Sequence, residues 1–286
     1  MNLRKWYQKL GLLGIKARAS NVSAEVPSKD YFVYSSNLKD LLTLTSITCE
    51  DNLESIVEAT QKKWLRPQGK ERWDILELYS PKEVNKIRLL AEGMGFFQEV
   101  LPKEKFYDYA LVLGAIFSSV QDRFSFLIKL WKMGVRFREL IFLAGERTLD
   151  PRIEPASIFL ETGKAPKNET EMMQYVYDHW KMPKEMKELP FQIVSVPFDV
   201  KKGRRPSTGD TIQAWMDLFP KPGKCLFVSN QPYCLYQDLV VKNYLPKSFL
   251  FETVGSPVNS SDTSGSVLLD TIARCLYQEL QNRKKI

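Results

Sequence analysis

Residues 107–114, YDYALVLG, are the stretch that decides the fold. They form a short apolar run that ends in glycine, and residues 120–133 follow as a helical stretch that Gly134 closes. A second apolar run, residues 139–145 (ELIFLAG), again ends in glycine. Apolar runs without strict alternation are typical of strands that helices cover on both faces. This unit therefore predicts two buried strands joined by a helix.

The same alternation of apolar runs and helical stretches continues toward the C-terminus. Further strands are predicted at residues 191–196, 225–229 and 249–254, and further helices at residues 170–180, 208–218, 232–244 and 266–281. Five repeats of strand then helix predict an α/β fold, Rossmann-like and doubly wound, with a mostly parallel five-stranded sheet. We assign this Rossmann-like α/β domain to residues 101–286.

Residues 1–100 are predicted to form an α-helical N-terminal region. Helical runs are expected near residues 38–47, 52–65 and 73–79. Ser80, Pro81 and Glu83 predict a further helix start, with serine at the cap and proline at the first helical position. Periodic apolar side chains need a surface against which they are buried, so this region is expected to pack on the sheet domain.

The composition is that of an ordinary globular protein. Hydrophobic residues make up 44% and charged residues 26%, which excludes a disordered chain, a collagen-like chain and a small disulfide scaffold. The 41 Lys and Arg exceed the 34 Asp and Glu, for a formal net charge of +7. This mild excess favours a small anionic ligand; specific nucleic-acid binding usually shows a denser basic face. The single histidine, His179, excludes multi-histidine zinc sites.

The cysteines and the N-terminal segment bear on the compartment. Four cysteines without any CxxC pair predict free thiols in a reducing compartment such as the cytoplasm. No stretch reaches the roughly 18 apolar residues that a membrane span needs. Residues 1–18 are basic and amphipathic. They are compatible with a helix packed on the body, with peripheral membrane contact, or with organelle targeting.

Ligands of open parallel sheets bind beyond the carboxyl ends of the strands, near the switch in strand order. This rule selects five loops, residues 114–119, 145–168, 197–207, 229–232 and 255–265. The second and third loops exceed the usual length of about 2–6 residues, so they are expected to form lids or walls of a site.

The first of these loops predicts an anion site at a helix start. Gly114 allows a ligand to approach the backbone closely, and Ser118 or Ser119 is expected to cap the helix. The alternative is a simple capped turn without a ligand. The loop lacks the glycine patterns of dinucleotide-binding domains and of P-loops, so neither is predicted.

The third loop predicts a second anion-binding feature. Residues 201–205, KKGRR, supply four cations, including Arg204 and Arg205, just before a helix start at Ser207 and Thr208. Arginine binds phosphate or carboxylate as a planar fork. The alternative is a solvated charged loop followed by an ordinary cap.

Carboxylates in the second loop leave two interpretations open. Glu146, Asp150 and Glu154 are suited to hold Mg²⁺ or to act as acid and base. They are equally suited to pair with Arg147 and Arg152.

Several short stretches share an order of motifs with a known family. They are residues 111–115 (LVLGA) with Asp122, Arg123 and residues 129–134, residues 140–145 (LIFLAG), residues 169–173 (ETEMM), residues 207–211 (STGDT) and residues 226–230 (LFVSN). Over residues 105–254 this order resembles the YdcF/SanA-like family of bacteria, a Rossmann-like domain of unknown function. The resemblance implies a nucleotide-like anionic ligand, with S-adenosylmethionine as one candidate cofactor. The family typically has His then Arg after the fourth strand, where Tyr233 and Tyr236 stand here.

These arguments converge on one predicted site. The ligand-binding residues are predicted to be Gly114, Ser118, Ser119, Arg123, Gly145, Arg204, Arg205, Ser207, Thr208, Ser229 and Asn230. Glu146, Glu169 and Asp210 are the candidates for acid or base, in a transferase or hydrolase acting at a phosphate or sugar. The rival hypothesis is a non-catalytic interaction module on the same scaffold. Convergence of Arg123, Glu169 and Asp210 on one pocket favours the ligand site.

Overall fold

The structure is a computed structural model that describes residues 33, 35–162, 165–198 and 204–285. The basic segment 1–18 lies outside the described residues, as do Lys201 and Lys202 of the basic loop. Among the helices that the structure describes, none is long and apolar enough to cross a membrane.

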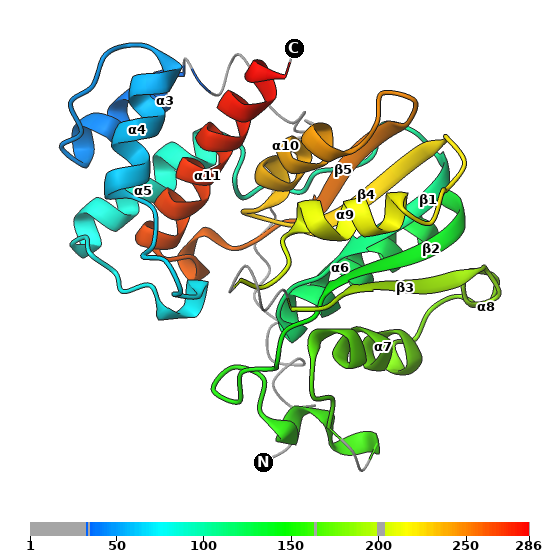
Figure 1. Cartoon of the computed structure of the whole chain (residues 1–286). Coiled ribbons are helices and arrows are strands. Elements are labelled where there is room, and N and C mark those ends of the chain that lie inside the picture. Colours follow the sequence, from blue (N-terminus) through cyan, green and yellow to red (C-terminus); the bar gives the residue numbers. More distant parts are fainter. Residues whose placement is uncertain (1–32, 34, 163–164, 199–203, 286) are drawn as a thin grey trace, which may run out of the picture.

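Five parallel strands form the central sheet, in the order β3-β2-β1-β4-β5 (Figure 1). The strands are β1 (Phe106–Leu113), β2 (Arg136–Gly145), β3 (Phe191–Val196), β4 (Lys224–Asn230) and β5 (Leu250–Ser256). The chain runs outward from β1 through β2 to β3, and then returns to the other side of β1 for β4 and β5. The switch in strand order therefore lies between β1 and β4. This is the Rossmann-like doubly wound fold that the sequence predicted.

Helices cover both faces of the sheet. Helices α6 (Phe117–Lys132) and α7 (Glu169–His179) pack on one face, and α9 (Thr208–Met216) and α10 (Cys234–Tyr244) pack on the other. In β1, Val112 belongs to the core under α6 and α7, whereas its neighbour Leu111 belongs to the core under α9 and α10. Both faces are buried, which is why the strands are continuous apolar runs.

The described part of the N-terminal region packs on the C-terminal helix. Helices α3 (Ser36–Leu44), α4 (Leu53–Lys63) and α5 (Pro81–Gly93) share a core with α11 (Gly265–Lys284), as Figure 1 shows in blue, cyan and red. Helix α11 also packs on α10, which joins this core to the sheet. The predicted start of α5 is confirmed, since Ser80 caps the helix in a capping box with Glu83.

The helix predicted at residues 73–79 is wrong. Between α4 and α5 the chain forms only a short 3₁₀ turn, η2 (Arg72–Asp74), and is otherwise non-helical. Tertiary contacts hold it in this form, because Glu77 accepts hydrogen bonds from Ser264 Oγ (2.8 Å) and from the Gly265 N–H (2.7 Å) at the start of α11. We call residues 64–79 the crossing segment. The other short helices in the described part of the chain are η3 (Ala156–Thr162), α8 (Lys184–Lys187) and η4 (Ser260–Asp262).

Candidate functional site

A cavity of about 830 Å³ lies at the carboxyl ends of the strands. Gly114 after β1, Gly145 at the end of β2 and Asn230 at the end of β4 line it, and residues from the loops after β3 and β5 also contribute. All five loops selected from the sequence therefore reach one cavity. The crossing segment supplies a further wall with Arg72 and Trp73.

The structure brings most of the predicted ligand-binding residues together. Those that line the cavity are Gly114, Ser118, Ser119, Arg123, Gly145, Arg204, Arg205, Ser207, Thr208 and Asn230. Ser229 does not line the cavity: it is fully buried, and its Oγ lies 3.5 Å from the Asn230 carbonyl oxygen. Of the three predicted catalytic carboxylates, only Glu169 lines the cavity.

Arg123 is buried at the switch in strand order, with 1% of its surface exposed. Its Nε donates to Asn230 Oδ1 (2.8 Å), and its Nη1 donates to the carbonyl oxygens of Leu113 (2.7 Å) and Gly114 (2.8 Å). These bonds tie α6 to the ends of β1 and β4 and aim the guanidinium at the cavity.

The charge of Arg123 has no carboxylate in direct contact among the described residues, and Glu169 acts on it only from a longer distance. No described carboxylate lies within ion-pair distance of it, and its Nη2 makes no hydrogen bond within the described part of the chain. Burial, followed by the nearby positive charge of Arg72, lowers the pKa of Arg123 to about 10. The group is still charged at neutral pH, and an uncompensated buried charge is costly. An anion in the cavity would offset that cost.

Helix α6 begins one residue before the predicted cap. Ile116 occupies the cap position without a side-chain hydrogen bond, so the prediction that Ser118 or Ser119 caps the helix is wrong. A distant carboxylate takes this role, because the Phe117 N–H donates to Glu154 Oε1 (2.8 Å). The N–H groups of Ser118 and Ser119 have no acceptor in the described structure, and both residues line the cavity. Such N–H groups favour an anion.

Glu169 lies at the floor of the cavity and is almost fully buried. Its Oε1 accepts from the Gly145 N–H (3.1 Å) and its Oε2 from Arg147 Nε (2.9 Å). Arg147 also forms a bidentate pair with Glu154 (2.6 and 2.8 Å). Burial raises the pKa of Glu169, and the shared Arg147 opposes that shift only in part.

The other loop carboxylates are engaged by protein partners. Glu146 Oε1 accepts from Asn168 Nδ2 (3.1 Å), and Asp150 pairs with Arg152. Within the described residues, no group of three or more His, Cys, Asp or Glu side chains could hold a metal ion. The predicted arginine pairs form at Asp150 and Glu154, whereas Glu146 is bonded to Asn168 and to no described arginine.

Asp210 helps to cap helix α9 and does not line the cavity. It forms the capping box of α9 with Ser207, and Arg204 Nη1 donates to its Oδ2 (2.7 Å). The hydrogen bond from Arg204 holds the pKa of Asp210 well below its ordinary value, although burial opposes this. Arg205 lines the cavity but is paired within its wall, with its Nη2 3.2 Å from Glu71 Oε2 of the crossing segment. Arg123 and Glu169 therefore share one cavity, as the ligand hypothesis expects, whereas Asp210 does not line it.

The wall formed by the crossing segment was not found from the sequence. The Arg72 guanidinium stacks on the Tyr233 ring, 3.8 Å from its centroid, and Trp73 Nε1 donates to Asp150 Oδ2 (3.0 Å). At the far side, Arg66 and Arg274 line the cavity, and the deeply buried Asp270 accepts from both of them. The only available signal was the charged, turn-forming stretch 66–72 (RPQGKER) between two helices.

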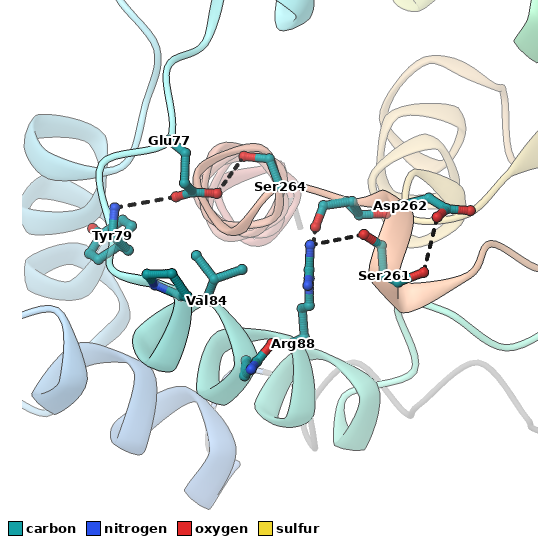
Figure 2. A pocket seen from close by; sticks show the side chains of 10 residues that line it. Glu77, Tyr79, Val84, Arg88, Ser261, Asp262 and Ser264 are labelled. Carbon is teal, nitrogen blue, oxygen red and sulfur yellow. Dashed lines mark hydrogen bonds between the residues drawn. The ribbon is translucent and has the colours of Figure 1, made fainter.

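A smaller pocket of about 420 Å³ lies between α5 and the start of α11 (Figure 2). Arg88 crosses it and donates to the carbonyl oxygens of Thr263 (2.9 Å) and Ser261 (3.0 Å). Glu77 on the other side bonds Ser264. These charged groups already have protein partners, so this pocket attaches α5 to α11 and is the weaker candidate for a ligand site.

Nucleophilic chemistry by cysteine and histidine finds no support in the structure. His179 is exposed at the end of α7, where its ring stacks on Tyr175 at 4.2 Å, and it does not line the cavity. Cys234 is buried beside Ser229, and burial raises its pKa to about 12. Cys225 and Cys275 are likewise buried free thiols.

Comparison with known protein families, with curated proteins and with solved structures finds no match for this chain. The fold and the cavity alone therefore define its class. It is a Rossmann-like α/β protein whose described residues place six arginines and three carboxylates around one cavity at the carboxyl ends of the strands.

Proposed function

We propose that this protein binds a small phosphate-bearing ligand in the cavity between β1, β4 and the crossing segment. The observation that carries the proposal is Arg123, a buried guanidinium without a carboxylate partner in the described structure. It lies beside the free N–H groups of Ser118 and Ser119. The unpartnered Nη2 of Arg123, combined with N–H groups at a helix start, suits the oxygen atoms of a phosphate.

The energetics support an anion at this point. A pKa lowered from 12.5 to about 10 corresponds to a cost of about 3 kcal/mol for the charged form of Arg123. A charge-assisted hydrogen bond contributes about 1.5–3 kcal/mol. One or two such bonds to a phosphate therefore suffice to offset the cost of burying the charge.

The cavity suits an organic ligand with an aromatic or sugar part. Its volume of about 830 Å³ falls within the range of small-molecule sites, roughly 300–1,000 Å³. Trp73, Tyr233 and Tyr236 add aromatic surface to its lining. S-adenosylmethionine remains a candidate through the resemblance to YdcF/SanA-like proteins. However, it carries a net positive charge at neutral pH, so an arginine-rich cavity favours a nucleotide or a sugar phosphate.

Chemistry on the ligand would depend on Glu169. It is the only predicted acid or base that lines the cavity, and its raised pKa suits proton transfer at a phosphate or sugar. Binding without chemistry is the second candidate function. Glu146 and Asp210 are held by Asn168 and Arg204, which favours this second candidate.

A thermal-shift panel of nucleotides, sugar phosphates and S-adenosylmethionine tests the proposal. A ligand at a hundred times its Kd should stabilise the protein by about 2.7 kcal/mol, or roughly 5 °C in Tm. Product analysis with the Glu169→Gln variant then separates the two candidates, because a catalytic Glu169 predicts loss of turnover with the thermal shift retained. If no phosphate compound shifts Tm, the proposal is wrong.

A further inference from the structure

We infer that the N-terminal region completes the ligand site, with Arg72 of the crossing segment binding the second of two adjacent phosphate groups. The ligand class is then a diphosphate or a longer phosphate chain, free or carried on an organic group. This inference rests on the proposed function and adds a residue and a charge requirement that the fold alone does not supply.

Tyr233 holds Arg72 in place, and no described carboxylate compensates the charge of Arg72. The ring of Tyr233 lies under the guanidinium at 3.8 Å, which fixes the plane of the group. Its Nε is buried and has no hydrogen-bond partner, and the guanidinium forms no ion pair with a described residue. Because the guanidinium lines the cavity without a carboxylate partner in the described structure, its charge there indicates an anion supplied by a ligand.

The other cavity arginines near Arg72 have partners. Arg205 lies next to Glu71, and Arg66 shares a buried aspartate with Arg274. Only Arg72 and Arg123 remain without a carboxylate among the cavity arginines in the described residues. The two are close enough to influence each other, because the charge of Arg72 adds to burial in lowering the pKa of Arg123.

A diphosphate offers one phosphate group to each of the two guanidinium groups, whereas a ligand with one charged group must share its oxygen atoms between them. Two phosphates in a row present oxygen atoms to Arg72 and to the unpartnered Nη2 of Arg123, and their negative charge offsets the repulsion between the two cations. Glu169 at the floor does not take this role, because its oxygens already accept from Arg147 and Gly145. The cavity therefore selects for charge number as well as for charge sign.

Isothermal titration with pyrophosphate and with orthophosphate, at low salt, tests the inference on the full chain. We expect the wild type to bind pyrophosphate at least tenfold more tightly than orthophosphate. Arg72→Gln should weaken pyrophosphate binding roughly tenfold to a hundredfold and leave orthophosphate binding unchanged. Arg152→Gln is the matched control, an exposed arginine that pairs with Asp74 of the same segment and should alter neither affinity.

Each outcome separates this inference from the proposed function. Failure of the wild type to bind either anion contradicts both. Equal affinity for the two anions contradicts only the requirement for a second phosphate. If Arg72→Gln weakens both anions equally, or neither, then Arg72 does not hold a second group. Arg72→Lys keeps the charge but lacks the planar guanidinium group. Its affinity for pyrophosphate should lie between those of the wild type and Arg72→Gln, and its Tm should be unchanged.

Discussion

Replacement of Arg123 by methionine should abolish ligand binding while leaving the stability of the ligand-free protein nearly unchanged. The side chain donates three hydrogen bonds to Leu113, Gly114 and Asn230, and losing them costs about 1 kcal/mol each when the effect of the charge is counted separately, through the pKa. The same change removes a buried charge that costs about 3 kcal/mol, given its pKa of about 10 against 12.5. The two terms nearly cancel, so the free energy of unfolding should change by no more than about 1–2 kcal/mol.

Urea unfolding of the ligand-free protein and the thermal shift with the best phosphate compound measure these two effects separately. Arg88→Met is the matched control, because Arg88 also donates to two backbone carbonyls but lines only the smaller pocket. It should lose about 1–2 kcal/mol of stability and keep the full ligand shift. A retained ligand shift in Arg123→Met refutes the assignment of Arg123 to the ligand. A loss of more than about 4 kcal/mol refutes the argument that its charge is uncompensated.

Two further substitutions and one labelling experiment test other parts of the structure. Gly114→Ala should lower the free energy of unfolding by about 1–3 kcal/mol, because an added Cβ would lie 2.7 Å from the Leu143 carbonyl oxygen and would press on Glu169; unchanged urea stability contradicts this. Asp270→Asn should cost about 3 kcal/mol near neutral pH. Burial alone would raise the pKa of Asp270, but its arginine partners hold it below the ordinary value, so its contribution is present above about pH 4 and is lost as pH falls further. The difference in the free energy of unfolding between wild type and Asp270→Asn should therefore shrink toward pH 3. If urea unfolding gives the same difference at every pH, the ion pairs of Asp270 do not have this role. Thiol labelling at pH 8, followed by mass spectrometry, should modify the half-buried Cys49 before Cys234, whose pKa burial raises to about 12; rapid labelling of Cys234 in the native state contradicts its burial.

The five strands and the edge where a ligand would bind could be predicted from local pattern. Runs such as residues 107–114 are mostly apolar because helices bury both faces of the sheet. Each buried position needs an apolar side chain, so the strand can be recognised from its own residues. The rule that ligands lie beyond the carboxyl ends then selected Gly114 and Asn230 without knowledge of their contacts, and the order of motifs that resembles the YdcF/SanA-like family added Arg123. The capping box at Ser80 could be predicted for the same reason, since its partners lie three residues apart.

The tertiary structure alone decided which polar groups are free. Glu154, and not Ser118 or Ser119, accepts the hydrogen bond at the start of α6, and Arg204 donates to Asp210. The local spacing of residues specifies neither contact. The hydrogen bonds of Glu77 to the start of α11 hold the crossing segment in a non-helical form. This segment places Arg72 at the cavity, although the strands that border the cavity come much later in the sequence. A pattern in sequence records which faces are buried, because burial repeats with the period of a helix or strand. The pairing of charges depends on distances between distant segments, and these exist only after the chain has folded.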